Sequence, residues 1–181
     1  VTGVQTCALP ICEMFITGTV TEFQIGGQEL WIDCLRFEVD PNGGGQECED
    51  AIVDHADLPL TGSWSAGDTL STSGVDVSIS DFQSSFGPLS GGAVTSDARL
   101  ACGDDYELGT YNVQATYDFA GSIGTLVNVN VLVSDQGGEV NLGVNGAPVA
   151  NAADYADLDG ATIGGATITV VSGGRDGDCT E

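Results

Sequence analysis

The sequence predicts an all-β protein, an antiparallel β-sandwich, with a β-barrel as the alternative. Apolar and polar residues alternate along many short segments, most clearly between Tyr111 and Val144. Glycine is abundant, with 27 residues, and it clusters in candidate turns. Helical periodicity is scarce, since only residues 148–160, with Ala-Asp-Tyr-Ala-Asp-Leu, could form one helical turn. Many short strands joined by Gly-rich turns are typical of sandwiches and barrels.

The segment from Tyr111 to Val144 is the centre of the predicted core. Its alternating apolar residues form three groups: Tyr111, Val113, Ala115, Tyr117 and Phe119; Val127, Val129, Val131 and Val133; and Val140, Leu142 and Val144. Residues 120–125 and 135–138 separate the groups. Alternation places each group on one face of a strand, so we expect a β-meander with one buried face.

Three long strands are expected before this segment. Residues 15–25 are rich in β-branched side chains, and residues 30–39 carry apolar side chains on both faces, as central strands do. Between them, Gly26-Gly27 has the composition of a hairpin turn. Residues 68–80 alternate again, and the glycine at position 74 indicates a bulge.

Shorter strands and loops make up the other parts of the chain. Further strands are expected at 51–53, at 98–102, and at 161–171 with a bend at Gly164-Gly165. The expected loops are 40–50, 58–67, 81–97 and 103–109, each rich in Gly, Pro, Ser or Asp. The longest of them, 81–97, is predicted to be a surface loop or a seam between two sheets.

The first twelve residues are set apart from the fold prediction. Val1–Ile11 reads VTGVQTCALPI and resembles, letter for letter, the in-frame translation of a widely used sequencing-library adapter. The codon of Cys12 would begin with the last base of that adapter. We therefore expect residues 1–12 to be an assembly artefact and exclude them. A genuine N-terminal strand or a lipoprotein-like tail ending at Cys12 is the alternative.

Residues 13–181 have the length of one ordinary domain with a real core. We predict a single β-sandwich, and two packed halves that meet near residue 98 are the alternative. No apolar run approaches the roughly 18 residues of a membrane-spanning helix, so no membrane span is expected in this sequence.

The charge balance is extreme, with 27 acidic residues, three arginines, no lysine and a net charge of −24. A polyanion of this kind repels phosphate backbones and anionic lipids, which argues strongly against nucleic-acid binding. Three explanations of the acidity stay open. The carboxylates hold Ca²⁺, they keep the protein soluble in a saline medium, or they form an ordinary solvated surface.

The cysteines indicate an oxidising, extracellular setting. Outside residues 1–12 there are four: Cys34, Cys48, Cys102 and Cys179. They form no CxxC pair, which argues against zinc and redox chemistry, and an even set is typical of secreted domains. Of the three connectivities, we favour Cys34–Cys48, which closes a Gly-rich loop, and Cys102–Cys179. Free buried thiols are the alternative.

One Asp-rich turn is a candidate Ca²⁺ site. Asp154, Asp157, Asp159 and Gly160 form the pattern D-x-x-D-x-D-G, which brings carboxylates close together in a tight turn. It lacks the downstream Glu of an EF-hand, and an ordinary turn with Asx caps is the alternative. The acidic loop 40–50 is a weaker second candidate.

A further Ca²⁺ site depends on the predicted disulfide between Cys102 and Cys179. Pairing these cysteines would bring together five carboxylates from two acidic clusters: Asp104, Asp105 and Glu107, and Asp176 and Asp178. Like charges at such a distance repel one another unless a cation lies between them. The disulfide and the Ca²⁺ prediction therefore support each other, and Arg175 is an alternative source of neutralisation.

The sequence contains no motif that selects a catalytic residue. Its one histidine, His55, stands between Asp54 and Asp57 and is predicted to be solvated in an acidic loop. No G-x-S-x-G nucleophile elbow occurs. We therefore expect no enzyme, although paired carboxylates for glycoside hydrolysis stay open as the third alternative.

Among the aromatic residues, Trp64 is the candidate contact for a sugar, because it stands in a predicted loop. Trp31, Tyr111 and Tyr117 are expected in the core.

Taken together, these sequence features lead us to expect a bacterial or archaeal domain of metagenomic origin that is secreted or on the cell surface. Its predicted role is a non-catalytic structural or adhesive module, stiffened by Ca²⁺ and disulfides, with a matrix or surface protein as partner. A carbohydrate-binding module with an extracellular glycan ligand is the second reading, and a hydrolase fragment the third.

Overall fold

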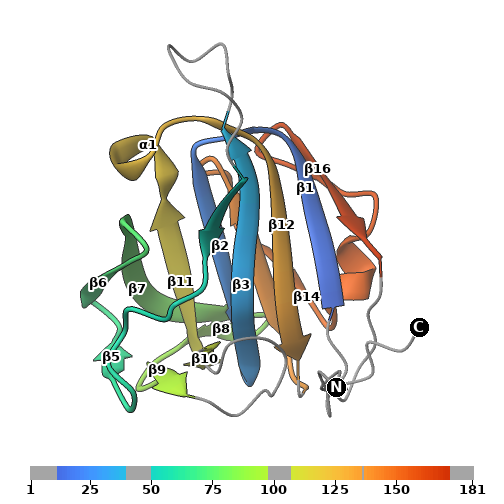
Figure 1. Cartoon of the computed structure of the whole chain (residues 1–181). Helices are drawn as coiled ribbons and strands as arrows, with labels where there is room; N and C mark the ends of the chain where they lie inside the picture. The colour runs from blue at the N-terminus through green and yellow to red at the C-terminus, as the bar shows by residue number, and fades with distance from the viewer. Residues whose placement is uncertain (1–11, 40–49, 98–106, 136, 172–181) are drawn as a thin grey trace, which may run out of the picture.

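The computed structural model describes residues 12–39, 50–97, 107–135 and 137–171, and it is a sandwich of two antiparallel sheets (Figure 1). In these residues the first sheet has nine strands, and β4 (Asp50–Val53) pairs with the side of β3 that β10 also pairs with. The other eight strands of this sheet follow in spatial order: β15 (Thr162–Ile163), β16 (Ala166–Val170), β1 (Cys12–Val20), β12 (Leu126–Asp135), β3 (Leu30–Val39), β10 (Glu107–Tyr111), β9 (Ala93–Asp97) and β5 (Ser63–Ser65).

The second sheet has seven strands in the same residues, and all its pairings are antiparallel as well. Six strands follow in spatial order: β14 (Ala150–Ala152), β13 (Val140–Val144), β2 (Glu22–Gly27), β11 (Val113–Asp118), β7 (Val75–Ser84) and β6 (Thr69–Thr72). The seventh, β8 (Gly87–Leu89), pairs with the end of β7. Helix is limited to one turn, α1 (Phe119–Ser122), and a 3₁₀ turn, η1 (Tyr155–Leu158), which lies inside the predicted helical segment.

The core lies between the two sheets, and the alternation that predicted the sandwich is confirmed there. Val129, Val131 and Val133 of β12 are fully buried, and so are Val113 and Tyr117 of β11. Val127 is the exception. The register of β12 against β3 shifts between Leu126 and Asn128, so Leu126 takes the buried place and Val127 is only half-buried.

The predicted β-meander is wrong. β11 lies in the second sheet between β2 and β7, β12 lies in the first sheet between β1 and β3, and β13 returns to the second sheet beside β2. The chain thus passes from one sheet to the other between consecutive strands, and each such passage is called a crossing below. Both sheets turn one face to the same core, so alternation predicts which side chains point inward without telling which sheet holds the strand.

The crossings also correct the predictions for the first strands. Residues 15–25 were expected to be one strand, but the chain leaves the first sheet after Val20 and enters the second at Glu22. Gly26 and Gly27 belong to β2, and β2 and β3 lie in different sheets, so no hairpin forms there. A second crossing occurs at Asn112, whose φ of 55° suits asparagine, between Tyr111 in β10 and Val113 in β11.

The structure corrects two of the predicted connecting segments and confirms a third. Ser73 and Gly74, with φ of 50° and 77°, form the two-residue turn between β6 and β7 rather than a bulge. The predicted loop 81–97 contains the end of β7, β8 and β9. The bend at Gly164-Gly165 is confirmed, since both glycines have positive φ between β15 and β16.

Candidate functional site

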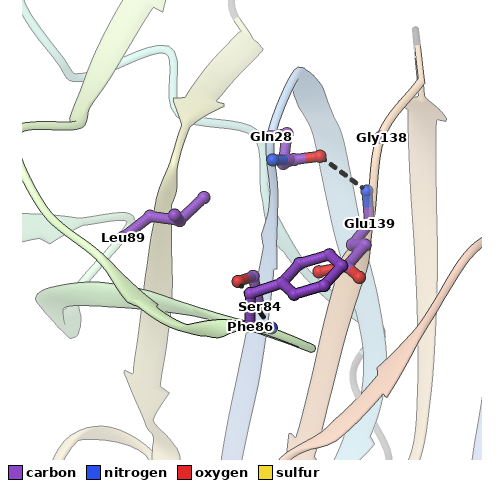
Figure 2. A pocket seen from close by; sticks show the side chains of 6 residues that line it. All are labelled: Gln28, Ser84, Phe86, Leu89, Gly138 and Glu139. Carbon is purple, nitrogen blue, oxygen red and sulfur yellow. Dashed lines mark hydrogen bonds between the residues drawn. The ribbon is translucent and has the colours of Figure 1, made fainter.

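A pocket of about 290 Å³ lies where the β7–β8 hairpin meets two other turns (Figure 2). Gln28 comes from the turn between β2 and β3, and Gly138 and Glu139 directly precede β13. The hairpin supplies the other lining residues: Ser84, Phe86 and Leu89. The pocket therefore depends on how firmly the hairpin is held against β13 and β14.

Hydrogen bonds hold the tip of this hairpin. The Ser85 N–H donates to Glu139 Oε2 at 2.9 Å, and the Ser85 hydroxyl donates to Glu139 Oε1. Farther along the hairpin, Asn151 of β14 donates through Nδ2 to the carbonyl of Gln83 at 2.9 Å. The hairpin is thus bound at two points, to Glu139 just before β13 and to Asn151 in β14, both far from it in the sequence.

Glu139 is also fixed from the side of Gln28. The Gln28 N–H donates to the Glu139 carbonyl at 3.2 Å, and the Glu139 N–H donates to Gln28 Oε1 at 3.0 Å. Gly138 makes this approach close, because a Cβ there would lie 2.5 Å from Gln28 Oε1. Hydrogen bonds from the Ser85 side chain, and then from the Ser85 N–H and Asn151, lower the pKa of Glu139. The pocket therefore contains a positioned, ionised carboxylate.

Phe86 provides the apolar side of the pocket. Its side chain is 98% exposed, against 53% for Leu60 and 59% for Val171, the other exposed large hydrophobic residues of the described ranges. Its N–H donates to Ser84 Oγ at 3.2 Å, and Ser84 Oγ donates to the Gly87 carbonyl at 2.7 Å, so the turn that carries the ring is hydrogen-bonded. In Figure 2 the ring extends toward the Glu139 carboxylate.

Three comparisons with known proteins gave no match, since no protein-family model, curated protein or solved structure matches this chain. Of the helices in the described residues, none has the length and apolar character needed to cross a membrane.

Phe86 was not among the site residues predicted from the sequence. The signal was present as Ser84-Ser85-Phe86-Gly87-Pro88, an aromatic residue set among turn-forming residues. The residues beside it are not apolar residues that alternate as in a buried strand. An isolated aromatic residue in such a turn is expected to be exposed. The partner groups, Gln28 and Glu139, lie far from it in the sequence and have no pattern that links them to it.

The predicted Ca²⁺ turn has another use for two of its carboxylates. Asp154 caps η1 by accepting a hydrogen bond from the Ala156 N–H at 2.8 Å, and Asp159 accepts one from the Val170 N–H at 2.9 Å. Asp157 is exposed. No group of three or more His, Cys, Asp or Glu residues in the described ranges is arranged to hold a metal ion. Asp104, Asp105, Asp176 and Asp178 lie outside those ranges.

The disulfide prediction stays a prediction. Cys34 is buried in β3, whereas Cys48, Cys102 and Cys179 lie outside the described residues. The prediction that residues 1–12 are an assembly artefact also stays a prediction, since residues 1–11 lie outside the described ranges. Cys12 begins β1 and pairs with Val133 of β12.

The prediction that Trp64 lies in a loop is wrong. The residue lies in the edge strand β5, which pairs with β9. Its side chain is half-buried and packs against the core. A Cβ at Gly62 would lie 2.4 Å from Trp64 Cη2, so the indole ring covers this glycine. A part of the ring is thus committed to packing, and the predicted role in ligand binding stays a prediction.

The prediction that His55 is solvated is wrong, because the residue is fully buried. Its Nδ1 lies 3.1 Å from the Asp33 carbonyl, and its Nε2 lies 3.0 Å from the Tyr117 hydroxyl. The carbonyl can only accept, so Nδ1 carries the proton and the Tyr117 hydroxyl donates to Nε2. Burial lowers the pKa of His55 to about 4, although the charges of Asp54 and Asp57 raise it. The histidine is therefore a neutral, hydrogen-bonded part of the core.

Proposed function

We propose that this chain is a non-catalytic, acidic β-sandwich module of a secreted or cell-surface protein, with a structural or adhesive role. The observation that carries the proposal is the way polar side chains are used. Four aspartates accept hydrogen bonds from backbone N–H groups and so close turns or cap helices: Asp54, Asp68, Asp118 and Asp154. Asp159 accepts one from the Val170 N–H at the end of β16. These five carboxylates therefore serve the scaffold.

The exposed ring of Phe86 supports a binding role over a purely structural one. Exposed apolar surface rimmed by polar groups marks contact sites on folded domains. Here the ring lies at the same pocket as Glu139 and Gln28. A rigid sandwich that presents such a pocket on an anchored hairpin suits adhesion to a partner protein in a matrix or on a surface.

Bead retention tests the proposal. Beads coated with the folded chain, and beads coated with the same chain after irreversible unfolding, are washed over cells or secreted matrix at low and at physiological salt. The net charge of −24 is the same on both, so non-specific charge effects cancel in the comparison. Greater retention of the folded chain supports an adhesive module, and equal retention at both salt concentrations contradicts it.

A further inference from the structure

The pocket between Phe86 and Glu139 combines an exposed aromatic ring with a fixed carboxylate. We propose that it binds an arginine side chain of a partner protein. The inference rests on the proposed adhesive function and names the chemistry by which the partner is recognised. It concerns one site on the surface, so it can fail while the adhesive function holds.

The ring supplies a face for a planar cation. The Phe86 side chain is 98% exposed, so both its faces are open to a ligand. Its backbone is fixed by Ser84 within the turn and by Ser85, which binds Glu139. A guanidinium group stacks on aromatic faces, and the attraction comes from the negative face of the π-system. The turn therefore fixes the backbone position from which the ring projects.

The carboxylate supplies the counter-charge. The lowered pKa of Glu139 keeps it ionised, and the two hydrogen bonds from Ser85, one to each carboxylate oxygen, hold it in one orientation. Each carboxylate oxygen has more than one lone pair, so the group can accept further hydrogen bonds from the five donors of a guanidinium. Gln28 Oε1 offers another acceptor at the same pocket, beyond the bond it accepts from the Glu139 N–H.

Charge over the whole chain favours the same ligand. The chain carries a net charge of −24 and contains no lysine, so its field attracts a basic partner and repels an anionic one. Neither arginine nor histidine occurs among the residues that line the pocket. A volume of about 290 Å³ suits one side chain better than an extended ligand.

The test is an NMR titration of the full chain with three small probes. The first is the capped peptide acetyl-Gly-Arg-Gly-amide, the second is the same peptide with citrulline in place of arginine, and the third is methyl glucoside. Citrulline keeps the shape of arginine and removes its charge. We expect the arginine peptide to shift the Phe86 ring signals and the Ser85 amide signal saturably, with the citrulline peptide at least about fivefold weaker.

Two variants separate this pocket from the general acidic surface. Phe86→Leu keeps an apolar side chain and removes the π-system, so it should weaken arginine-peptide binding about two- to fivefold. Leu60→Ala, at another exposed apolar residue, should leave the affinity unchanged. Phe86→Trp should preserve or strengthen binding, since indole is the best cation–π partner.

Four results would overturn the proposal. Equal shifts with citrulline would remove the charge from recognition, and unchanged affinity in Phe86→Leu would assign binding to the diffuse acidic surface. No shift with the arginine peptide would leave the pocket without this ligand. Saturable shifts of the Phe86 signals by methyl glucoside, and not by the arginine peptide, would make the pocket a sugar site. Bead retention reports on adhesion separately. Folded-chain retention without arginine binding removes only this inference, whereas arginine binding without retention removes only the adhesive function.

Discussion

Asn145 Oδ1 accepts two hydrogen bonds from Thr21, one from its N–H at 2.8 Å and one from its hydroxyl at 3.0 Å. The same side chain donates through Nδ2 to the carbonyls of Thr19 at 2.7 Å and Gly164 at 2.9 Å. Thr21 is the corner where the chain passes from β1 to β2, and Gly164 is in the turn between β15 and β16. One amide therefore joins both sheets at this end of the sandwich.

Replacing this amide by a carboxylate should destabilise the fold. In Asn145→Asp the two Nδ2 donors disappear, and a negative charge faces the carbonyl oxygens of Thr19 and Gly164. We expect the free energy of unfolding to fall by about 1–3 kcal/mol, the cost of unmade hydrogen bonds at a partly buried site. Urea denaturation measures the change at pH 7.

Asn112→Asp is the matched control for that substitution. Asn112 also has a positive φ, 55°, and is also half-buried, but it takes no part in the network around Thr21. The control therefore adds the same charge in the same backbone conformation. Similar losses of stability in the two variants would show that charge, rather than the network, is responsible.

Two adjacent glycines test how closely the β15–β16 turn packs against β13. A Cβ at Gly164, with φ of 57°, would lie 2.0 Å from the Val144 carbonyl oxygen, whereas one at Gly165, with φ of 84°, would meet no atom within 4 Å. Gly165→Ala should cost only the backbone strain, about 1–2 kcal/mol. Gly164→Ala adds steric overlap, so its loss should exceed that of Gly165→Ala by about 1–3 kcal/mol in urea denaturation. Equal losses would contradict the close contact.

The fold class could be predicted because apolar residues alternate along β11, β12 and β13, and all of these alternating residues except the half-buried Val127 are buried, whichever sheet holds the strand. The sheet assignment could not, since it depends on where the chain crosses the core. At Thr21 nothing in the local sequence marks the crossing, and its hydrogen-bond partner, Asn145, is 124 residues away. At Asn112 the sole signal is a residue that tolerates positive φ.

The candidate site shows the same division between local and long-range information. The Ser- and Gly-flanked position of Phe86 could indicate an exposed ring, whereas its pairing with Glu139 depends on a hairpin that reaches across the second sheet. His55 was misjudged because its acidic neighbours in the sequence, Asp54 and Asp57, suggest a solvated loop. Its environment is set by Asp33 of β3 and Tyr117 of β11, which are distant in the sequence.

The Ca²⁺ prediction stays a prediction for both of its candidate sites. They are the turn with Asp154, Asp157 and Asp159, and the clusters outside the described residues, Asp104 with Asp105 and Asp176 with Asp178. A cation that binds only the folded chain must raise its melting temperature. At 100 times its dissociation constant, Ca²⁺ would add about 2.7 kcal/mol of stability, or roughly 5–10 °C for a domain of this size. A calorimetric melt in EDTA is compared with one in Ca²⁺, with Mg²⁺ as the control for ionic strength. Coincident melts would remove the Ca²⁺ prediction.

The hydroxyl of Tyr117 should contribute to stability through His55. Burial raises the pKa of Tyr117, so its hydroxyl stays protonated and available as a donor. In Tyr117→Phe the acceptor Nε2 of His55 is left without its partner inside the core. We expect a loss of about 1–3 kcal/mol in the free energy of unfolding. In a double-mutant cycle with His55→Asn, the combined loss should be smaller than the sum of the single losses, whereas additivity would mean that the two side chains do not interact.

The free energy of unfolding should decrease as the pH is lowered from 6.5 to about 4, which are the ordinary and the folded-state pKa values of His55. Its pKa is about 4 in the folded chain, where burial disfavours the charged ring, against 6.5 as the ordinary value. The unfolded chain therefore binds a proton that the folded chain does not, at every pH between these values. His55 contributes its full stability above pH 6.5, and the contribution is lost as pH falls through 4, by about 3 kcal/mol in total.

The variant His55→Asn isolates this effect from the titration of the many carboxylates, and asparagine tolerates the positive φ of 58° at this position. Urea denaturation of both proteins at pH 7, 6, 5 and 4 gives the difference in unfolding free energy at each pH. That difference should shrink by most of the 3 kcal/mol as pH is lowered, because the native chain alone carries the buried imidazole. Two parallel pH profiles would show that His55 is protonated in the folded chain as readily as in the unfolded one.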